Sequence, residues 1–343
     1  NKAYLQDAVK TWRNNFDWRK HETKLNEAGS FKYKTNSGLE LHYLHKKSNS
    51  KNAIPLLLTH GWPGSVQEFL KIIPELAAGK GGIEFDVVCP SIPGYGFSDK
   101  PQELGMNSKE VAKLENELML ALGYEKYIAQ GGDWGSMITK WIAELFPENC
   151  IGIHLNLVIA FPPEGEDSMQ GVLQEEIEGM KNIEKYQATG YGYFAIQSTK
   201  PQTVGYGLND SPVGLAAWII EKFHGWTKDD SDKLVVPLDD VLAIVSLYWH
   251  TESITSSARF YYENGPLGFT FNPVSQPMAG AIFENEIARP PRVWAEKIYN
   301  IVQWNQYPGG HFAALENPKI LSEDFFILSV CSLDFNSINI FSI

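Results

Sequence analysis

The chain has 343 residues, of which 43% are hydrophobic and 13% aromatic, enough to build a sizeable core in one large or two small domains. Its net charge of −12, without any lysine- and arginine-rich run, argues against nucleic acid as a partner. Three widely spaced cysteines and only short apolar runs argue against a disulfide framework, a cysteine metal centre and a membrane-spanning protein.

Residues 1–38 predict an N-terminal arm that packs on the core. Apolar side chains recur there at helical spacing, which is typical of an amphipathic helix. They are Leu5, Val9, Trp12 and Phe16. Alternating residues on either side of the turn-forming segment 36–38 predict a β-hairpin.

Residues 39–160 predict the first part of an α/β core. Compact apolar runs are separated there by amphipathic stretches of helix length. Strands that alternate with helices are typical of a mostly parallel sheet flanked by helices on both faces. The runs lie at residues 54–59, 85–89, 127–130 and 151–155.

Residues 161–267 break this alternation. Helical, aromatic-rich sequence with an acidic opening at 164–184 predicts an inserted helical lid domain. Residues 268–343 return to the core pattern, with strand-like runs at 278–283 and 301–304, a Gly-Gly turn and a helical tail.

Asp133 lies at the centre of the most specific motif, GGDWGS at residues 131–136, between a predicted strand and a helix predicted for 136–145. The pattern Gly-x-nucleophile-x-Gly in this setting is the nucleophile elbow of α/β-hydrolases. A carboxylate, with a reference pKa of ~3.9, is ionised at neutral pH and needs no base to attack. A histidine is then free to activate water, so the motif predicts displacement at a saturated carbon followed by ester hydrolysis.

The loop HGWPG at residues 60–64 directly follows the predicted strand 54–59. In α/β-hydrolases this loop supplies one N–H of the oxyanion hole, and the residue after the nucleophile supplies the other. Here those backbone donors are Trp62 and Trp134. We expect His60 to brace the loop and not to transfer protons.

His311, in GGHF at residues 309–312, follows the last predicted strand and completes the chain order nucleophile, acid, histidine. Either Glu284 or Glu286, in the segment 283–286, can supply the acid that fixes the tautomer of His311. Alternation along a strand end predicts that both carboxylates lie on one face.

The segments 60–65, 91–98, 131–136 and 309–314 resemble those of the microsomal epoxide hydrolase family, which includes the insect juvenile hormone epoxide hydrolases. The resemblance extends from about residue 12 to residue 326. It implies conversion of a bulky apolar epoxide to a vicinal diol, with water as the second substrate and no cofactor or metal.

The same resemblance implies a role for each site residue. Asp133 is the nucleophile, His311 the water-activating base and Glu286 its acid, whereas Glu284 replaces a proline common in the family. The two tyrosines that assist ring opening correspond to Tyr193 and Tyr261. A phenol, with a pKa near ~10, can donate a hydrogen bond to the epoxide oxygen while it stays neutral.

Two other functions fit parts of this pattern. Haloalkane dehalogenases share the aspartate elbow and the histidine, but a leaving halide needs no proton from Tyr193 or Tyr261. A non-catalytic carrier of apolar ligands would keep the pocket without the catalytic residues. Hormone turnover and detoxification are both compatible with the sequence.

The expected location is intracellular. We expect microsomal or endoplasmic reticulum membrane association if a hydrophobic anchor segment, missing from this chain, exists at the N-terminus. Without such an anchor we expect a cytoplasmic protein.

Overall fold

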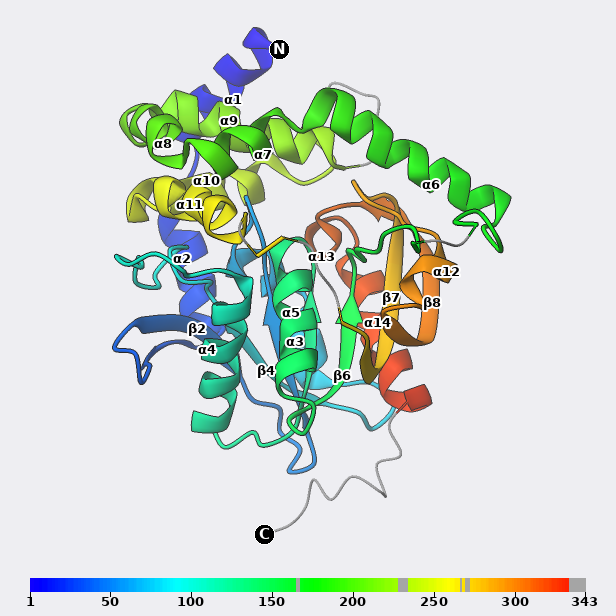
Figure 1. Ribbon diagram of the computed structural model, residues 1–343. Coiled ribbons are helices and arrows are strands. Elements are labelled where there is room, and N and C mark those ends of the chain that lie inside the picture. The colour runs from blue at the N-terminus through cyan, green and yellow to red at the C-terminus, as the bar shows by residue number, and fades with distance from the viewer. Residues whose placement is uncertain (165–166, 228–233, 266, 269–271, 333–343) are drawn as a thin grey trace.

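The apolar runs of the sequence form an eight-stranded sheet with helices on both faces and a helical lid above it (Figure 1). The computed structural model describes residues 1–164, 167–227, 234–265, 267–268 and 272–332. This architecture confirms the predicted α/β-hydrolase fold. The strands are β1 (Ser30–Lys34), β2 (Glu40–Lys46), β3 (Ile54–Thr59), β4 (Phe85–Pro90), β5 (Tyr127–Gly131), β6 (Cys150–Leu155), β7 (Val274–Asn285) and β8 (Tyr299–Gly310).

The strand order is β1-β2-β4-β3-β5-β6-β7-β8. The predicted hairpin forms the antiparallel edge of β1 and β2, and the strands from β4 to β8 pair in parallel. The pairing of strand ends brings the functional loops together. Thr59 at the end of β3 pairs with Gly131 at the end of β5, so the loops after these two strands are neighbours. Asn285 at the end of β7 pairs with Gly310 at the end of β8, so the loops after β7 and β8 are neighbours too.

The two faces of the sheet bury different helices. Leu57 belongs to a core cluster with α4 (Ser108–Ala121) and α5 (Trp134–Leu145). Its neighbours Leu56 and Leu58 belong to the cluster on the opposite face. That cluster contains side chains of α3 (Ile73–Ala78), α13 (Ala313–Glu316) and α14 (Pro318–Ser332). The alternation of side chains along a strand explains why β3 is buried on both sides.

The lid is helical, as the sequence predicts for this region. Its helices are α6 (Gln174–Lys185), the π-helix η2 (Tyr186–Gly190), α7 (Gly192–Thr199), α8 (Pro201–Asp210), α9 (Pro212–Gly225), α10 (Leu238–Thr251) and α11 (Ile254–Asn264). A further short helix, α12 (Arg292–Ala295), lies in the second part of the core. In Figure 1 the lid lies across the end of the sheet where the functional turns emerge.

The N-terminal arm contacts the lid as well as the core. Helix α1 (Lys2–Asn14) contacts the lid, because the indole of Trp12 donates a hydrogen bond of 2.7 Å to Ser246 Oγ on α10. Helix α2 (Trp18–Glu27) also reaches the lid, through His21 and Asp239, 3.0 Å apart. Other parts of the arm contact the core, because Leu25 of α2 belongs to the cluster that contains Leu56, and β1 pairs with β2. An apolar stripe shows that one helix face is buried, but not against which partner.

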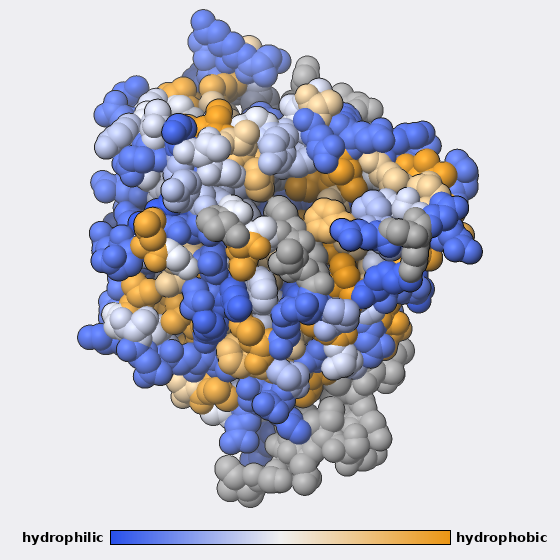
Figure 2. Space-filling model, viewed as in Figure 1, coloured by the Kyte–Doolittle hydropathy of each residue, from blue (hydrophilic) through white to orange (hydrophobic). Residues whose placement is uncertain are grey.

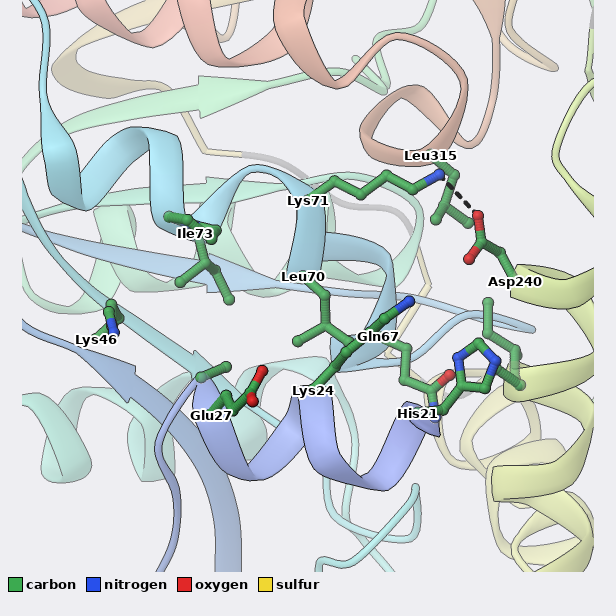
Figure 3. Close-up of a pocket in the computed structure, with 14 residues that line it drawn as sticks. His21, Lys24, Glu27, Lys46, Gln67, Leu70, Lys71, Ile73, Asp240 and Leu315 are labelled. Atoms are coloured by element: carbon green, nitrogen blue, oxygen red, sulfur yellow. Dashed lines mark hydrogen bonds and ion pairs between the residues drawn. The ribbon is translucent and has the colours of Figure 1, made fainter. Parts of the chain in front are cut away.

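The arm, the lid and the core meet around a cavity of about 440 Å³ (Figure 3). It lies between α2, α10 and the short 3₁₀ helix η1 (Val66–Lys71). Lys71 and Asp240 form an ion pair of 2.7 Å there, which joins η1 to the lid. Within the described ranges, no helix has the length and apolar character required to cross a membrane.

Candidate active site

Asp133 occupies a strained turn between β5 and α5. Its φ of 49° and ψ of −129° are unusual for a residue with a side chain, and such conformations cost about 1–3 kcal/mol. A side chain at Gly131 would overlap the backbone of Gly135, and one at Gly135 would overlap the carbonyl of Thr59. The glycines thus permit a turn that presents the Asp133 carboxylate beyond the edge of the sheet. Helix α5 begins two residues before the predicted start.

The loop after β3 contacts this carboxylate directly. The Trp62 N–H donates a hydrogen bond of 2.7 Å to Asp133 Oδ1, and a side chain at Gly61 would overlap the carboxylate. Trp134 is the first residue of α5, but Asp133 makes no capping hydrogen bond to this helix. Of the two predicted oxyanion-hole amides, the Trp62 N–H therefore contacts the Asp133 carboxylate, whereas the carboxylate does not cap the helix that begins at Trp134.

His60 braces the same loop. Its Nδ1 lies 2.9 Å from the Gly61 carbonyl, and its Nε2 accepts a hydrogen bond of 3.2 Å from the Ile92 N–H. Burial lowers the pKa of His60 to about 4. A neutral ring held by two backbone groups agrees with a structural role.

His311 lies between two carboxylates at the end of β8. Its Nε2 is 3.4 Å from Asp133 Oδ2, and its Nδ1 is 2.6 Å from Glu286 Oε1. Burial disfavours the protonated ring, but the charges and hydrogen bonds of Glu286 and Asp133 outweigh it and raise the pKa of His311 well above its usual value. The imidazolium is thus stabilised while both neighbours are ionised.

The structure distinguishes the two glutamates of segment 283–286. Glu286 is 2% exposed and contacts His311, whereas Glu284 is exposed on the surface. The prediction that both lie on one face was wrong. Strand β7 ends at Asn285, and the Glu286 N–H donates to the Phe283 carbonyl, so a turn interrupts the alternation.

The two predicted tyrosines converge on the site from the lid. Tyr193 on α7 and Tyr261 on α11 are 5% and 2% exposed. Burial raises the pKa of both phenols well above the usual value, so both stay neutral hydrogen-bond donors. The Trp62 ring stacks on Tyr193 with centroids 5.1 Å apart, and the Trp134 ring meets Tyr261 edge-on at 4.9 Å.

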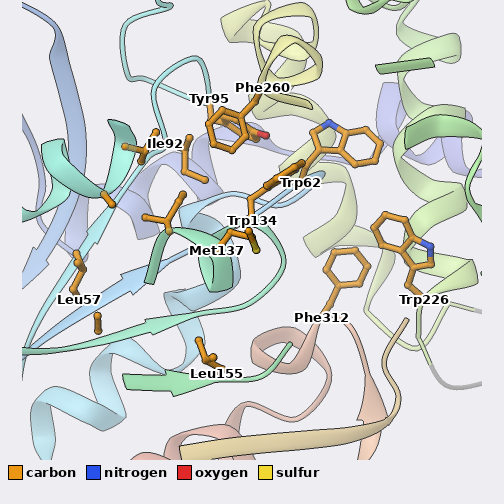
Figure 4. Close-up of a cluster of buried hydrophobic side chains, with 14 of the residues drawn as sticks. Leu57, Trp62, Ile92, Tyr95, Trp134, Met137, Leu155, Trp226, Phe260 and Phe312 are labelled. Carbon is orange, nitrogen blue, oxygen red and sulfur yellow. The ribbon is translucent and has the colours of Figure 1, made fainter. Parts of the chain in front are cut away.

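Figure 4 shows the indoles of Trp62 and Trp134 within the buried cluster that joins the core to the lid. The sequence motifs select these two residues for their amides only. Their rings also hold the tyrosines in place, which only the three-dimensional packing reveals.

Three further residues lie near Tyr193, of which the sequence motifs indicate neither Tyr186 nor Lys222. The Tyr186 hydroxyl lies 2.9 Å from the Tyr193 hydroxyl, and the ammonium of Lys222 lies 4.4 Å from the Tyr193 ring centroid. The backbone N–H of His311 donates a hydrogen bond of 2.9 Å to the backbone carbonyl of Trp226. Lys222 is buried, which is unusual for a lysine, but a single sequence carries no signal of that burial.

A pocket of about 540 Å³ opens between Asp133 and the tyrosines. Apart from Asp133 and Gln187, its lining is apolar or aromatic, and includes Met137, Leu157, Ile159, Phe161, Ile183 and Phe194. On the face seen in Figure 2, hydrophobic side chains gather below α6, between the lid and the core. The size and lining suit a bulky apolar molecule.

The arrangement combines a carboxylate, an imidazole with its own acid, and two neutral phenols around one apolar pocket. These groups suit attack on carbon, protonation of a leaving oxygen and activation of water. In the part of the chain that the structure describes, no group of three or more His, Cys, Asp or Glu residues is arranged to hold a metal ion.

Comparison with known proteins places this site in a family. Residues 1–69 match the family model "Epoxide hydrolase N terminus", and residues 54–173 match "alpha/beta hydrolase fold". Epoxide hydrolase 1 of Sus scrofa is 40% identical over 94% of this chain and 79% of its own length. Juvenile hormone epoxide hydrolase 1 of Ctenocephalides felis is 41% identical over 94% of this chain and 76% of its own length.

A solved structure agrees with these relatives. The epoxide hydrolase of Aspergillus niger superposes with a TM-score of 0.88 at 33% identity, over 96% of this chain and 86% of that one. These relatives favour an epoxide hydrolase over the dehalogenase and carrier alternatives. The chain therefore belongs to the epoxide hydrolase family and is an epoxide hydrolase with the α/β-hydrolase fold.

Proposed function

We propose that the chain hydrolyses epoxides through a covalent ester of Asp133. The observation that carries this proposal is the position of the Asp133 carboxylate between the Trp62 N–H, at 2.7 Å, and His311 Nε2, at 3.4 Å. One carboxylate oxygen attacks an epoxide carbon, and the carbon–oxygen bond of the ring breaks. The product of this step is an alkyl ester of Asp133 that carries a neighbouring alkoxide.

Tyr193 and Tyr261 assist that ring opening. As charge develops on the epoxide oxygen, the two phenols donate hydrogen bonds to it, and one phenol transfers its proton to the alkoxide. The proton that Asp133 releases after ester hydrolysis restores that phenol. Both tyrosines line the pocket together with Asp133, on the lid side of it. A substrate bound between them is attacked by Asp133 on one side and receives hydrogen bonds on the other.

His311 then drives hydrolysis of the ester. Esterification removes the charge of Asp133, which is one of the contributions that raise the pKa of His311. The lower pKa favours the neutral ring, which can accept a proton from water. Glu286 then stabilises the imidazolium that forms. The Trp62 and Trp134 amides hold the tetrahedral oxyanion, whose collapse releases the diol.

The preferred substrate is a bulky apolar epoxide. The pocket of about 540 Å³ is lined mainly by hydrophobic and aromatic side chains. The names of the relatives from Ctenocephalides felis and Bombyx mori include juvenile hormone, so epoxides of comparable apolar character are the first to assay.

Replacement of His311 tests the two-step reaction. The variant His311→Gln should form the alkyl ester and hydrolyse it very slowly, since attack needs only the ionised carboxylate. Intact-protein mass spectrometry should then detect an adduct of substrate mass, which Asp133→Asn should not form. Full turnover by His311→Gln would contradict the assignment.

A further inference from the structure

A second, much smaller cavity lies beside the nucleophile. It has a volume of about 20 Å³ and is lined by Asp133, His311, Glu68, Asn156 and parts of the loop at residues 60–64. A cavity needs roughly 10–15 Å³ to hold one water molecule, so this chamber has room for a single water. That water would contact both the nucleophile and the base of the proposed hydrolysis.

Glu68 is held at this chamber by local structure. The Ser65 N–H donates to Glu68 Oε1 at 3.1 Å, and the Gln67 N–H donates to Ser65 Oγ at 3.2 Å, which forms a capping box at the start of η1. A side chain at Gly64 would overlap the Glu68 carboxyl. The capping box uses Glu68 Oε1, so Oε2 is not part of it.

We propose that Glu68 is a further catalytic residue, which holds the attacking water during ester hydrolysis. This inference rests on the proposed Asp133 ester. The water donates one hydrogen bond to Glu68 Oε2, and its other proton transfers to His311 Nε2. Its oxygen bonds to the Asp133 carbonyl carbon, and the tetrahedral intermediate then breaks the bond to the substrate oxygen. That oxygen takes the proton from His311, which leaves a free diol and the Asp133 carboxylic acid. The acid still carries the second water proton, and its loss restores the carboxylate.

Glu68 can accept a hydrogen bond in either charge state. Burial is the largest contribution to its pKa and raises it to about 8, while the charge of His311 opposes this shift and the charge of Asp133 adds to it. Esterification changes both neighbouring charges, and their effects on the pKa of Glu68 oppose each other. A carboxylate and a neutral carboxyl group both present an acceptor oxygen to a water molecule, so the position of Glu68 at the chamber supports the proposal.

The variant Glu68→Gln tests the proposal with little change in shape. Its amide oxygen can still accept the Ser65 N–H, but an NH₂ group replaces Oε2 at the chamber. We expect alkylation within about 3-fold of the wild-type rate and hydrolysis slowed by ~10–10²-fold, the range for loss of a group that acts on a transferred proton. The alkyl-enzyme should then accumulate, and kcat and KM should fall together. Rapid mixing with tryptophan fluorescence, followed by intact-protein mass spectrometry, resolves the two steps.

Ser65→Ala is the matched control. It removes the other half of the capping box, and Ser65 does not line the chamber. We expect wild-type rates for both steps, with thermal unfolding measured for both variants. Wild-type hydrolysis by Glu68→Gln, or an equal deficit in Ser65→Ala, would overturn the proposal. Absence of an alkyl-enzyme in the wild-type protein and in His311→Gln would instead contradict the proposed function, and this inference with it.

Should Glu68→Gln fail to fold, Glu68→Asp provides the second variant. The shorter side chain keeps a carboxylate but draws it back from the chamber. Slower hydrolysis with normal alkylation supports the proposal, whereas wild-type values for both steps overturn it.

Discussion

Two carboxylates determine the pKa of His311: Asp133, 3.4 Å from Nε2, and Glu286, 2.6 Å from Nδ1. Both raise its pKa against the opposing effect of burial. Hydrolysis needs the neutral ring, so its rate falls as pH falls through the pKa that His311 has in the ester. Alkylation needs only ionised Asp133 and should not follow the titration of His311.

Asp133→Asn mimics the loss of charge in the ester. We expect a lower pKa for His311 in this variant than in the wild-type protein, but still one supported by Glu286. Titration of the His311 ring by NMR measures the difference. An unchanged pKa would show that Asp133 does not control the charge of the base.

The two neighbouring glutamates form a matched pair for testing the acid. Glu286→Gln should slow ester hydrolysis by ~10²–10⁴-fold, since loss of the orienting carboxylate costs ~10⁴ in the serine proteases. Glu284→Gln should change neither step, because that side chain is exposed. Single-turnover rates of the two variants decide the assignment, and a large defect in Glu284→Gln would reverse it.

At the scale of secondary structure elements, the lid helices α7 and α11 each bring one tyrosine to the pocket. The rings of Trp62 and Trp134 pack against those tyrosines from the core side. The same core loops thus contact both the nucleophile and the groups that face it. Loss of a phenol should affect ring opening and leave ester hydrolysis intact.

Tyr193→Phe and Tyr261→Phe should each slow alkylation by ~10–10³-fold, the range for loss of one donor or general acid. The double variant should nearly abolish alkylation. Rapid mixing with an epoxide substrate measures that step, and decay of isolated alkyl-enzyme measures hydrolysis. Alkylation by the double variant at the wild-type rate would show that both tyrosines only pack within the lid and do not assist ring opening.

The strands could be predicted from the sequence, because β3 to β6 are compact apolar runs between helices. The positions of Asp133, Trp62 and His311 could also be predicted, since each motif directly follows a strand end. The choice between Glu284 and Glu286 depended on a turn at the end of β7 that alternation does not reveal. The tyrosines came from family resemblance, and the contacts of Lys222 depend on tertiary packing.

At the scale of the whole molecule, the N-terminal arm connects the lid to the core. Helix α1 is joined to α10 by the hydrogen bond from Trp12 to Ser246, and α2 by His21 and Asp239. η1, which directly follows the loop that contacts Asp133, is joined to α10 by Lys71 and Asp240. The arm is therefore expected to stabilise the lid over the site.

Trp12→Ala should lower the free energy of unfolding by about 1–3 kcal/mol, through loss of a half-buried indole and its hydrogen bond. Arg13→Ala, at an exposed position in the same helix, should change it by less than about 0.5 kcal/mol. Denaturant unfolding measures both. Equal stability of the two variants would show that α1 does not contribute to the fold.

The covalent role of Asp133 is tested most directly by one turnover in heavy-oxygen water. With enzyme in excess over an apolar epoxide, the proposed mechanism requires that the oxygen added to the diol comes from Asp133. We expect mostly unlabelled diol, with the heavy oxygen recovered in the peptide that contains Asp133. Diol labelled in the first turnover, with an unlabelled Asp133 peptide, would contradict the covalent mechanism.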